Sequence, residues 1–100
     1  MGNISNLATT GSYTFEKDNL KVTFNFVINN ETKAITRIES GVVREDEKSL
    51  AEFYKNTYGP MMSEGERIQM NVLKGREVEL ATAITEAIAQ FEGKVKEGAI

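Results

Sequence analysis

Three consecutive acids, Glu45-Asp46-Glu47, form the densest cluster of chemically active side chains in this 100-residue sequence. Carboxylate oxygens are the ligands that hard divalent cations prefer, so the cluster first suggests a cation site. A calcium-binding loop, however, spaces its acids along about 12 residues with a central Gly, and this sequence lacks that spacing. Acids also favour the start of a helix, where the helix dipole attracts negative charge. We therefore interpret the cluster as a solvated helix start and predict no metal site.

The residue types that most often carry catalysis are missing from the sequence. It contains no His and no Cys, which removes the commonest general base, the thiolate nucleophile and the commonest transition-metal ligands. It also shows no Gly-rich phosphate loop and no nucleophile elbow. The sequence therefore predicts a protein that is not an enzyme and that needs no cofactor.

Four aromatic residues, Tyr13, Phe15, Phe24 and Phe26, fall on one face of two expected strands. Such a face could stack nucleic-acid bases, as single-strand binders do. Those platforms are normally ringed by Lys and Arg, whereas this face continues into aliphatic residues. We therefore predict that the aromatics form a core, together with Leu20, Val22 and Ile28.

A second group of apolar residues, Tyr58, Met61 and Met62, flanks the helix-breaking pair Gly59-Pro60. Met adapts to irregular surfaces and Tyr is enriched at interfaces, so this loop is a candidate partner-binding site. Tyr13 joins the same set of candidates, because its strand is expected at a sheet edge. Open edges recruit further strands unless charges or bulges blunt them.

These features lead to a first hypothesis for function and to one alternative. The first is a small non-enzymatic protein-interaction or assembly module that forms a homodimer or binds another protein. The segment from Ser12 to Phe15 supports it, because this stretch of the expected edge carries no charge. The alternative is a nucleic-acid-associated accessory protein with a local basic patch of Lys21, Lys33, Arg37 and Arg44.

Net charge and hydropathy limit the partners and the compartment. A formal net charge of −3 argues against a general nucleic-acid binder, whose surface is usually basic. No apolar run approaches the roughly 20 residues of a membrane span. The first residues lack the basic start and apolar core of a signal peptide. We therefore expect no membrane partner and a cytoplasmic location.

The expected fold is built around residues 20–28, where apolar residues occupy every second position. This alternation is typical of a half-buried strand. A preceding strand, Ser12–Glu16, joins it through a turn at Lys17-Asp18, which sets Phe15 opposite Leu20. A third strand runs from Ala34 to about Val43 and places Val42 on the inner face; Gly41 in that strand suggests a bulge or a close backbone approach.

The second half of the chain is expected to add two helices and another strand pair. Asp46 starts a helix that carries Leu50, Phe53, Tyr54 and Thr57 at helical spacing and ends at Gly59-Pro60. Residues 67–72 alternate as a strand, and Leu73-Lys74-Gly75 then loops into a second strand. The alternative starts the last helix directly at Arg76. From Thr82 onward the pattern is helical.

The predicted class is therefore α+β, an antiparallel meander of three strands with an additional hairpin, packed against two helices in the order βββ-α-(ββ)-α. Residues 1–11 are expected to be a flexible lead-in, and residues 12–97 a single domain.

Overall fold

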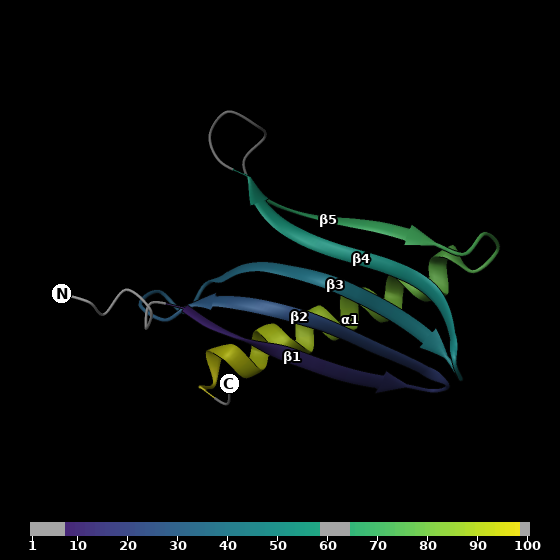
Figure 1. The fold of residues 1–100 in the computed structure, drawn as a ribbon, viewed down its shortest axis with the longest axis horizontal. Coiled ribbons are helices and arrows are strands. Elements are labelled where there is room, and N and C mark those ends of the chain that lie inside the picture. Colours follow the sequence, from purple (N-terminus) through teal and green to yellow (C-terminus); the bar gives the residue numbers. More distant parts are fainter. Residues whose placement is uncertain (1–7, 59–64, 99–100) are drawn as a thin grey trace.

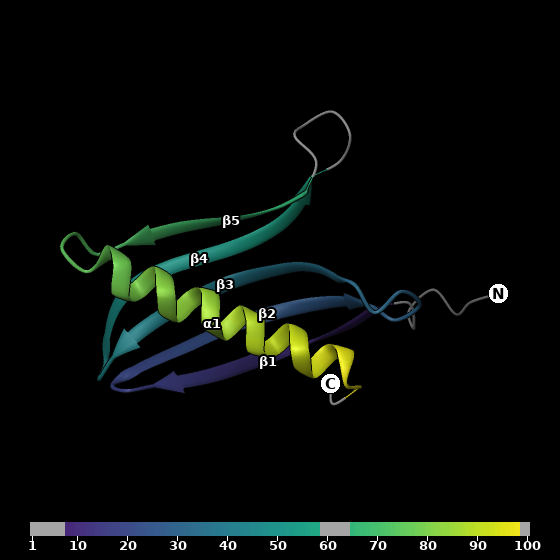
Figure 2. The ribbon, with the colours of Figure 1, turned by 180° about the vertical axis from the view of Figure 1, so that it is seen from behind.

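The computed structural model describes residues 8–58 and 65–98 (Figure 1). Its strands form one antiparallel sheet in sequence order, and its helix lies across one face of that sheet (Figure 2). The α+β class is therefore correct. The predicted order is not, because the described ranges hold one helix that follows all the strands. The elements are β1 (Ala8–Lys17), β2 (Leu20–Asn29), β3 (Ile35–Glu45), β4 (Lys48–Tyr58), β5 (Gly65–Val72) and α1 (Glu77–Lys96).

Strand β2 has the alternation that its sequence predicts. Lys21 and Asn25 are exposed on one face, and the apolar residues between them are buried on the other. The strand lies between β1 and β3, so its buried face sits beneath the helix. The buried residues of β2 are Leu20, Val22, Phe24, Phe26 and Ile28.

The β1–β2 hairpin turns at Asp18-Asn19, one residue later than expected. The first turn residue has a φ of 54°, a left-handed conformation that Asp tolerates better than most residues. Phe15 therefore lies opposite Val22, and Tyr13 lies opposite Phe24. The expected pairs are displaced by two residues, and an even displacement keeps the aromatic side chains on the core face.

Strand β1 begins at Ala8, so residues 8–11 belong to the sheet rather than to a lead-in. Thr9 and Thr10 are β-branched and suit a strand. Gly11 lies opposite Phe26, and a Cβ added at Gly11 would stand 2.8 Å from the Phe26 ring. The ring thus fills the space that a side chain at Gly11 would need. The lead-in expected at residues 1–7 lies outside the described residues.

The expectation of a helix starting at Asp46 is wrong, because this segment forms strand β4. A two-residue turn, Asp46-Glu47, joins β3 to β4, and Glu45 pairs with Lys48 across it. Asp46 has a φ of 59°, again in the left-handed region that Asp tolerates. The acidic cluster therefore closes a hairpin instead of capping a helix.

Two features of the β4 sequence explain why it was predicted as a helix. Leu50, Phe53 and Tyr54 have helical spacing, yet Tyr54 is exposed on the face opposite Phe53. The true inward residues are Ala51, Phe53 and Lys55, all buried. Because Lys55 is charged, the sequence of β4 does not show the alternation of apolar and polar residues that predicts a strand.

A bulge in β3 corrects the expected register of that strand. The pairing with β4 shifts between Ile38 and Gly41, where Ser40 has a φ of 55°. Val43 is consequently buried, and the expectation that Val42 faces inward is wrong. Gly41 itself lies beneath a ring, since a Cβ added there would stand 2.6 Å from carbons of Phe53. Both the bulge and the close approach expected at Gly41 are confirmed.

The expected second hairpin after Gly75 is wrong, and the alternative start of the last helix is correct. Gly75 has a φ of 96°, and α1 begins two residues later at Glu77. Val78 is 82% exposed whereas Leu80 is fully buried. The alternation of Val78 and Leu80 is therefore a coincidence of the helical pattern, whose buried face continues through Ile84.

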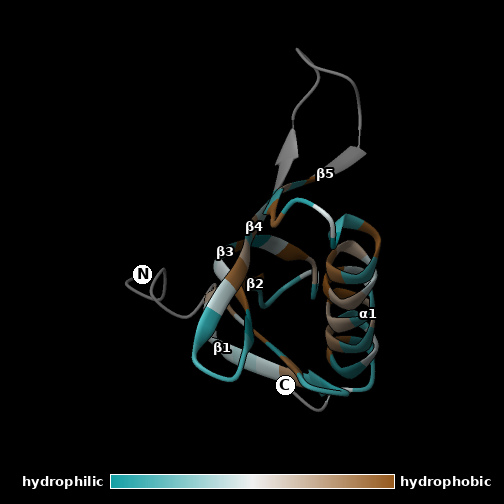
Figure 3. Ribbon diagram, turned by 90° about the vertical axis from the view of Figure 1, so that its right-hand side faces the viewer, coloured by the Kyte–Doolittle hydropathy of each residue, from teal (hydrophilic) through white to brown (hydrophobic). Residues whose placement is uncertain are grey.

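The core lies between α1 and the sheet, which form two layers when viewed along the sheet (Figure 3). Phe91 of the helix is its centre. The Phe91 ring lies 5.2 Å from Phe24 and 4.7 Å from Phe26, measured between centroids. The Phe24 ring also meets Phe53 edge-on at 5.9 Å. Edge-on and tilted geometries are the favourable ones for aromatic pairs.

We predict that Phe24→Ala destabilises the domain by about 3 to 5 kcal/mol, because it leaves a cavity beside the rings of Phe53 and Phe91. Urea unfolding followed by circular dichroism measures the loss. The matched control is Tyr54→Ala on the opposite face, where the residue is 46% exposed and the expected change is below about 1 kcal/mol. Equal effects of the two substitutions would contradict this assignment of the core.

Candidate functional site

The outer side of β1 presents a run of backbone hydrogen-bonding groups at one edge of the sheet. β1 lies at one edge of the sheet, and in residues 8–58 and 65–98 no strand pairs with its outer side. Lys17 and Leu20 flank the two-residue turn and so form a hydrogen-bonded pair. Alternate residues of β1 therefore bond to β2, and the residues between them direct their N–H and C=O groups outward. The outward residues are Ala8, Thr10, Ser12, Thr14 and Glu16.

The sequence of β1 does little to protect this edge. From Ala8 to Phe15 the strand has no charged residue and no Pro, although charge and Pro are the usual means of blocking strand addition. On the helix side, Tyr13 and Phe15 are only half-buried and pack at the margin of the core. A neighbouring strand would therefore cover both backbone groups and apolar side chains.

Two contacts hold β1 against the helix. The Tyr13 hydroxyl donates a hydrogen bond to Gln90 Oε1, and burial raises the pKa of that phenol. The Lys17 ammonium donates to Glu86, and this hydrogen bond raises the pKa of Lys17. Tyr13, predicted as a partner-binding residue, thus lies on the helix side with its ring against Phe91.

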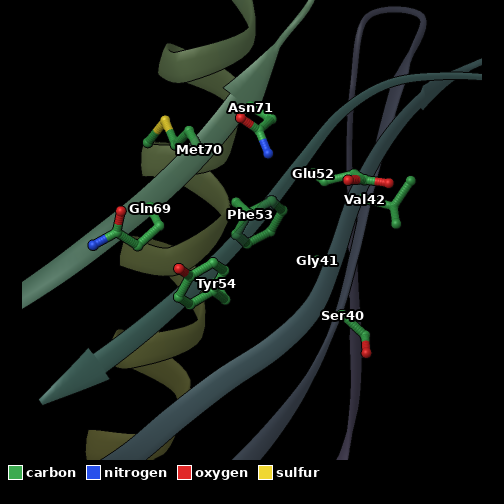
Figure 4. A pocket seen from close by; sticks show the side chains of 9 residues that line it. All are labelled: Ser40, Gly41, Val42, Glu52, Phe53, Tyr54, Gln69, Met70 and Asn71. Carbon is green, nitrogen blue, oxygen red and sulfur yellow. The ribbon is translucent and has the colours of Figure 1, made fainter.

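The open face, defined as the sheet face opposite α1, contains a hollow of about 430 Å³ over β3, β4 and β5 (Figure 4). Ser40 and Gly41, at the bulge of β3, form part of its wall. Tyr54 and Gln69 lie side by side at one end, where they are cross-strand partners. Glu52 lies at the other end, between Val42 and Asn71. The hollow offers hydroxyl, amide and carboxylate groups and contains no general base paired with a nucleophile.

The predicted basic patch is divided between two places. Lys21 and Arg44 are cross-strand partners on the open face, and Arg37 lies farther along β3 on the same face. Lys33 instead lines a separate hollow that the helix borders and that Lys55 also lines.

Acids are interleaved with the basic residues of the open face. Glu16 lies opposite Lys21, and Glu39 contacts Arg37 at 3.3 Å between Oε2 and Nε. Glu52 stands on the neighbouring strand. The open face therefore mixes both signs of charge, which favours a polar protein contact over a phosphate backbone.

The remaining predicted partner residues stand at or beyond the end of β4. Tyr58 is the last residue of that strand. Met61 and Met62 lie outside the described residues, so their loop stays a prediction.

Sequence reasoning missed the ion pairs that tie the helix to the sheet. Lys55 is 3% exposed, and its Nζ lies 3.4 Å from Glu92 Oε2. Arg76, just before α1, donates two bonds of 3.0 Å to the Glu45 carboxylate. The paired geometry fits the planar guanidinium. Only the assignment of β4 as a strand could have revealed that Lys55 points inward.

Two searches of the described residues give negative findings. No helix in these ranges combines the length and apolar character needed to cross a bilayer. No group of three or more acidic, His or Cys side chains in the same ranges is placed to hold a metal ion. Comparison of the chain with protein-family models, curated proteins and solved structures yields no match.

We predict that Lys55→Met leaves the fold intact with stability equal to or above that of the wild type, by up to about 2 kcal/mol, because burial of an ammonium is costly. Thermal unfolding measures it. The matched variant Glu92→Gln should instead lose about 1 to 2 kcal/mol, because it removes the Glu92 carboxylate from the buried ammonium of Lys55. The expected loss is small because the Glu92 side chain is 41% exposed. A large loss in Lys55→Met would contradict the prediction.

A second prediction concerns the stability of the fold at low pH. Hydrogen bonds from Arg76 lower the pKa of Glu45 and that of Glu79 below the ordinary value of 4.5. A carboxylate with a lowered folded-state pKa stabilises the fold above its unfolded pKa, and this contribution is lost as pH falls through the folded value. The melting temperature should therefore fall as pH decreases below about 4.5. In Arg76→Gln this fall should be shallower; an unchanged pH profile would show that the clamp does not form in solution.

Proposed function

We propose that the protein is a small non-enzymatic interaction module that binds a protein strand along the outer side of β1. The observation that carries this proposal is the edge itself: five residues direct their backbone groups outward along a strand that carries no charge from Ala8 to Phe15. Main-chain hydrogen bonds give affinity in strand addition, and the flanking side chains give specificity.

The side chains around β1 support the same proposal. Tyr13 and Phe15 are half-buried on the helix side, so a partner strand gains apolar contacts there. Thr10, Ser12 and Thr14 occupy the open-face side, where small polar residues permit close approach of a second strand. The mixed charges of the open face supply a polar rim, which is common around protein interfaces.

The proposal assigns no catalytic step and no cofactor. The hollow near Tyr54 is open to solvent and presents hydrogen-bonding groups, with no nucleophile paired to a general base among the residues that line it. It fits a secondary contact with an elongated partner that crosses the open face from the edge.

The test uses one substitution that removes an outward N–H. In Thr14→Pro the backbone donor on the free side is lost, whereas the β2 side is unaffected because residue 14 does not bond to β2. The matched control, Thr14→Val, keeps the N–H and the branched side chain. Each tagged protein is used to capture partners from native lysate, and the captured chains are identified by mass spectrometry.

We expect a captured protein, either foreign or an untagged copy of this chain, to be retained by wild type and Thr14→Val and lost by Thr14→Pro. Retention by all three would contradict strand addition at β1. Capture of nucleic acid with a steep loss at higher salt would instead favour the basic residues of the open face. Near-UV circular dichroism checks that each variant is folded.

A further inference from the structure

We propose that the strand that binds β1 is the β1 strand of a second copy, paired antiparallel about a two-fold axis that passes beside Ser12. This inference rests on the proposed function and identifies its partner. Three observations support it: the number and position of the outward groups, the identity of the facing residues, and the distribution of charge.

The outward backbone groups restrict the possible registers. They belong to the even-numbered residues from Ala8 to Glu16. Two such strands can form hydrogen-bonded pairs only when even residues face even residues. The register centred on Ser12 pairs all five outward residues of each copy, because Ser12 is the midpoint of the outward run. A displacement by one pair in either direction leaves only four pairs among the described outward residues.

The facing residues in this register are compatible on both faces. On the open face Thr10 faces the second copy's Thr14, a favourable cross-strand pair. On the helix side Tyr13 faces the second copy's Gly11, where the ring of Phe26 already fills the space above the glycine. Tyr13 therefore meets an aromatic ring instead of solvent.

Charge opposes neither the pairing nor this register. Glu16 faces Ala8 of the second copy, so the one charged outward residue does not face a like charge. Lys17 lies on the helix side, already paired with Glu86. Because antiparallel neighbours share their faces, the two helices lie on the same side of one continuous ten-stranded sheet.

The first experiment measures the mass of the purified untagged chain by sedimentation equilibrium over a wide concentration range. We expect a reversible dimer of twice the monomer mass. Thr14→Pro should weaken this association by about tenfold or more, because symmetry removes a bond at two places, and Thr14→Val should not. Amide exchange gives a second readout: the N–H groups of Ser12 and Thr14 should be protected in the dimer and exchange rapidly on dilution.

The second experiment fixes the register, which is possible because the chain contains no Cys. Hydrogen-bonded partners in an antiparallel pair have Cα atoms about 5.5 Å apart, within disulfide range. Ser12→Cys should therefore oxidise rapidly to a covalent dimer. Thr14→Cys alone should not, since its copies are about 14 Å apart. A mixture of Thr10→Cys and Thr14→Cys should form the mixed disulfide.

The outcomes separate this inference from the proposed function. A monomer at every concentration, with β1-dependent capture of a foreign protein, overturns the second copy as partner and keeps the edge as a binding site. Dimerisation with rapid oxidation of Thr14→Cys alone overturns the Ser12-centred register. A monomer without β1-dependent capture overturns both proposals.

Discussion

One helix has to cover the apolar face of five strands, and this geometric constraint determines much of the molecule. Neighbouring strands are about 4.8 Å apart, so five of them extend over about 19 Å between their outer axes. A helix with its side chains is only about 10 Å wide, and 20 residues give it a length of about 30 Å. α1 therefore crosses the sheet obliquely, from the end of β5 toward β1 (Figure 2). It covers the centre well and the edges incompletely.

The burial of the apolar side chains follows from the position of the helix over the sheet. The rings of Phe24, Phe53 and Phe91 gather between the helix and the inner strands of the sheet, where they are nearly fully buried. At the margins the apolar residues are only half-covered, as Phe15 and Met70 are on the two edge strands. The helix is then held in direction by polar contacts to different strands: Glu86 and Gln90 reach β1, Glu92 reaches β4, and Arg76 reaches the end of β3. The two helical ends are thereby tied to opposite parts of the sheet.

The parts of the fold that could be predicted are those in which one physical rule acts alone. Alternation gave β2, the inward rings of β1 and the strand at residues 67–72, since each has one buried and one exposed face. β4 could not be recognised, because the inward position 55 is occupied by a Lys, whose ammonium pairs with Glu92, a residue distant in sequence. The bulge at Ser40 likewise depends on pairing with β4, so local pattern could not place Val43 inside.

The candidate site was predictable in kind but not in geometry. The first strand was expected at an edge of the sheet, and the sheet order confirms this, with β1 outermost. The position of the turn decides which residues of β1 direct their backbone N–H and C=O groups outward. The turn was expected at Lys17-Asp18 and lies at Asp18-Asn19, and this shift of one residue exchanges the outward residues with those that bond to β2. With the turn at Asp18-Asn19, the outward groups belong to the small residues, and the aromatic residues bond to β2.

The two edge strands of the sheet, β1 and β5, differ in how well they are protected against the addition of another strand. β5 is the shorter strand, with eight residues, and Glu66 and Arg67 stand near its start. Short length and charge both discourage strand addition. β1 has ten residues and keeps its charges at one end.

A strand with so little protection is an aggregation hazard in a protein that stays monomeric, because further copies can add without limit. A two-fold pairing removes that hazard, since it consumes the exposed edge of both copies and leaves only the protected β5 edges outside. The same asymmetry would make a foreign strand compete with the second copy for one site, so a partner and self-association would exclude each other.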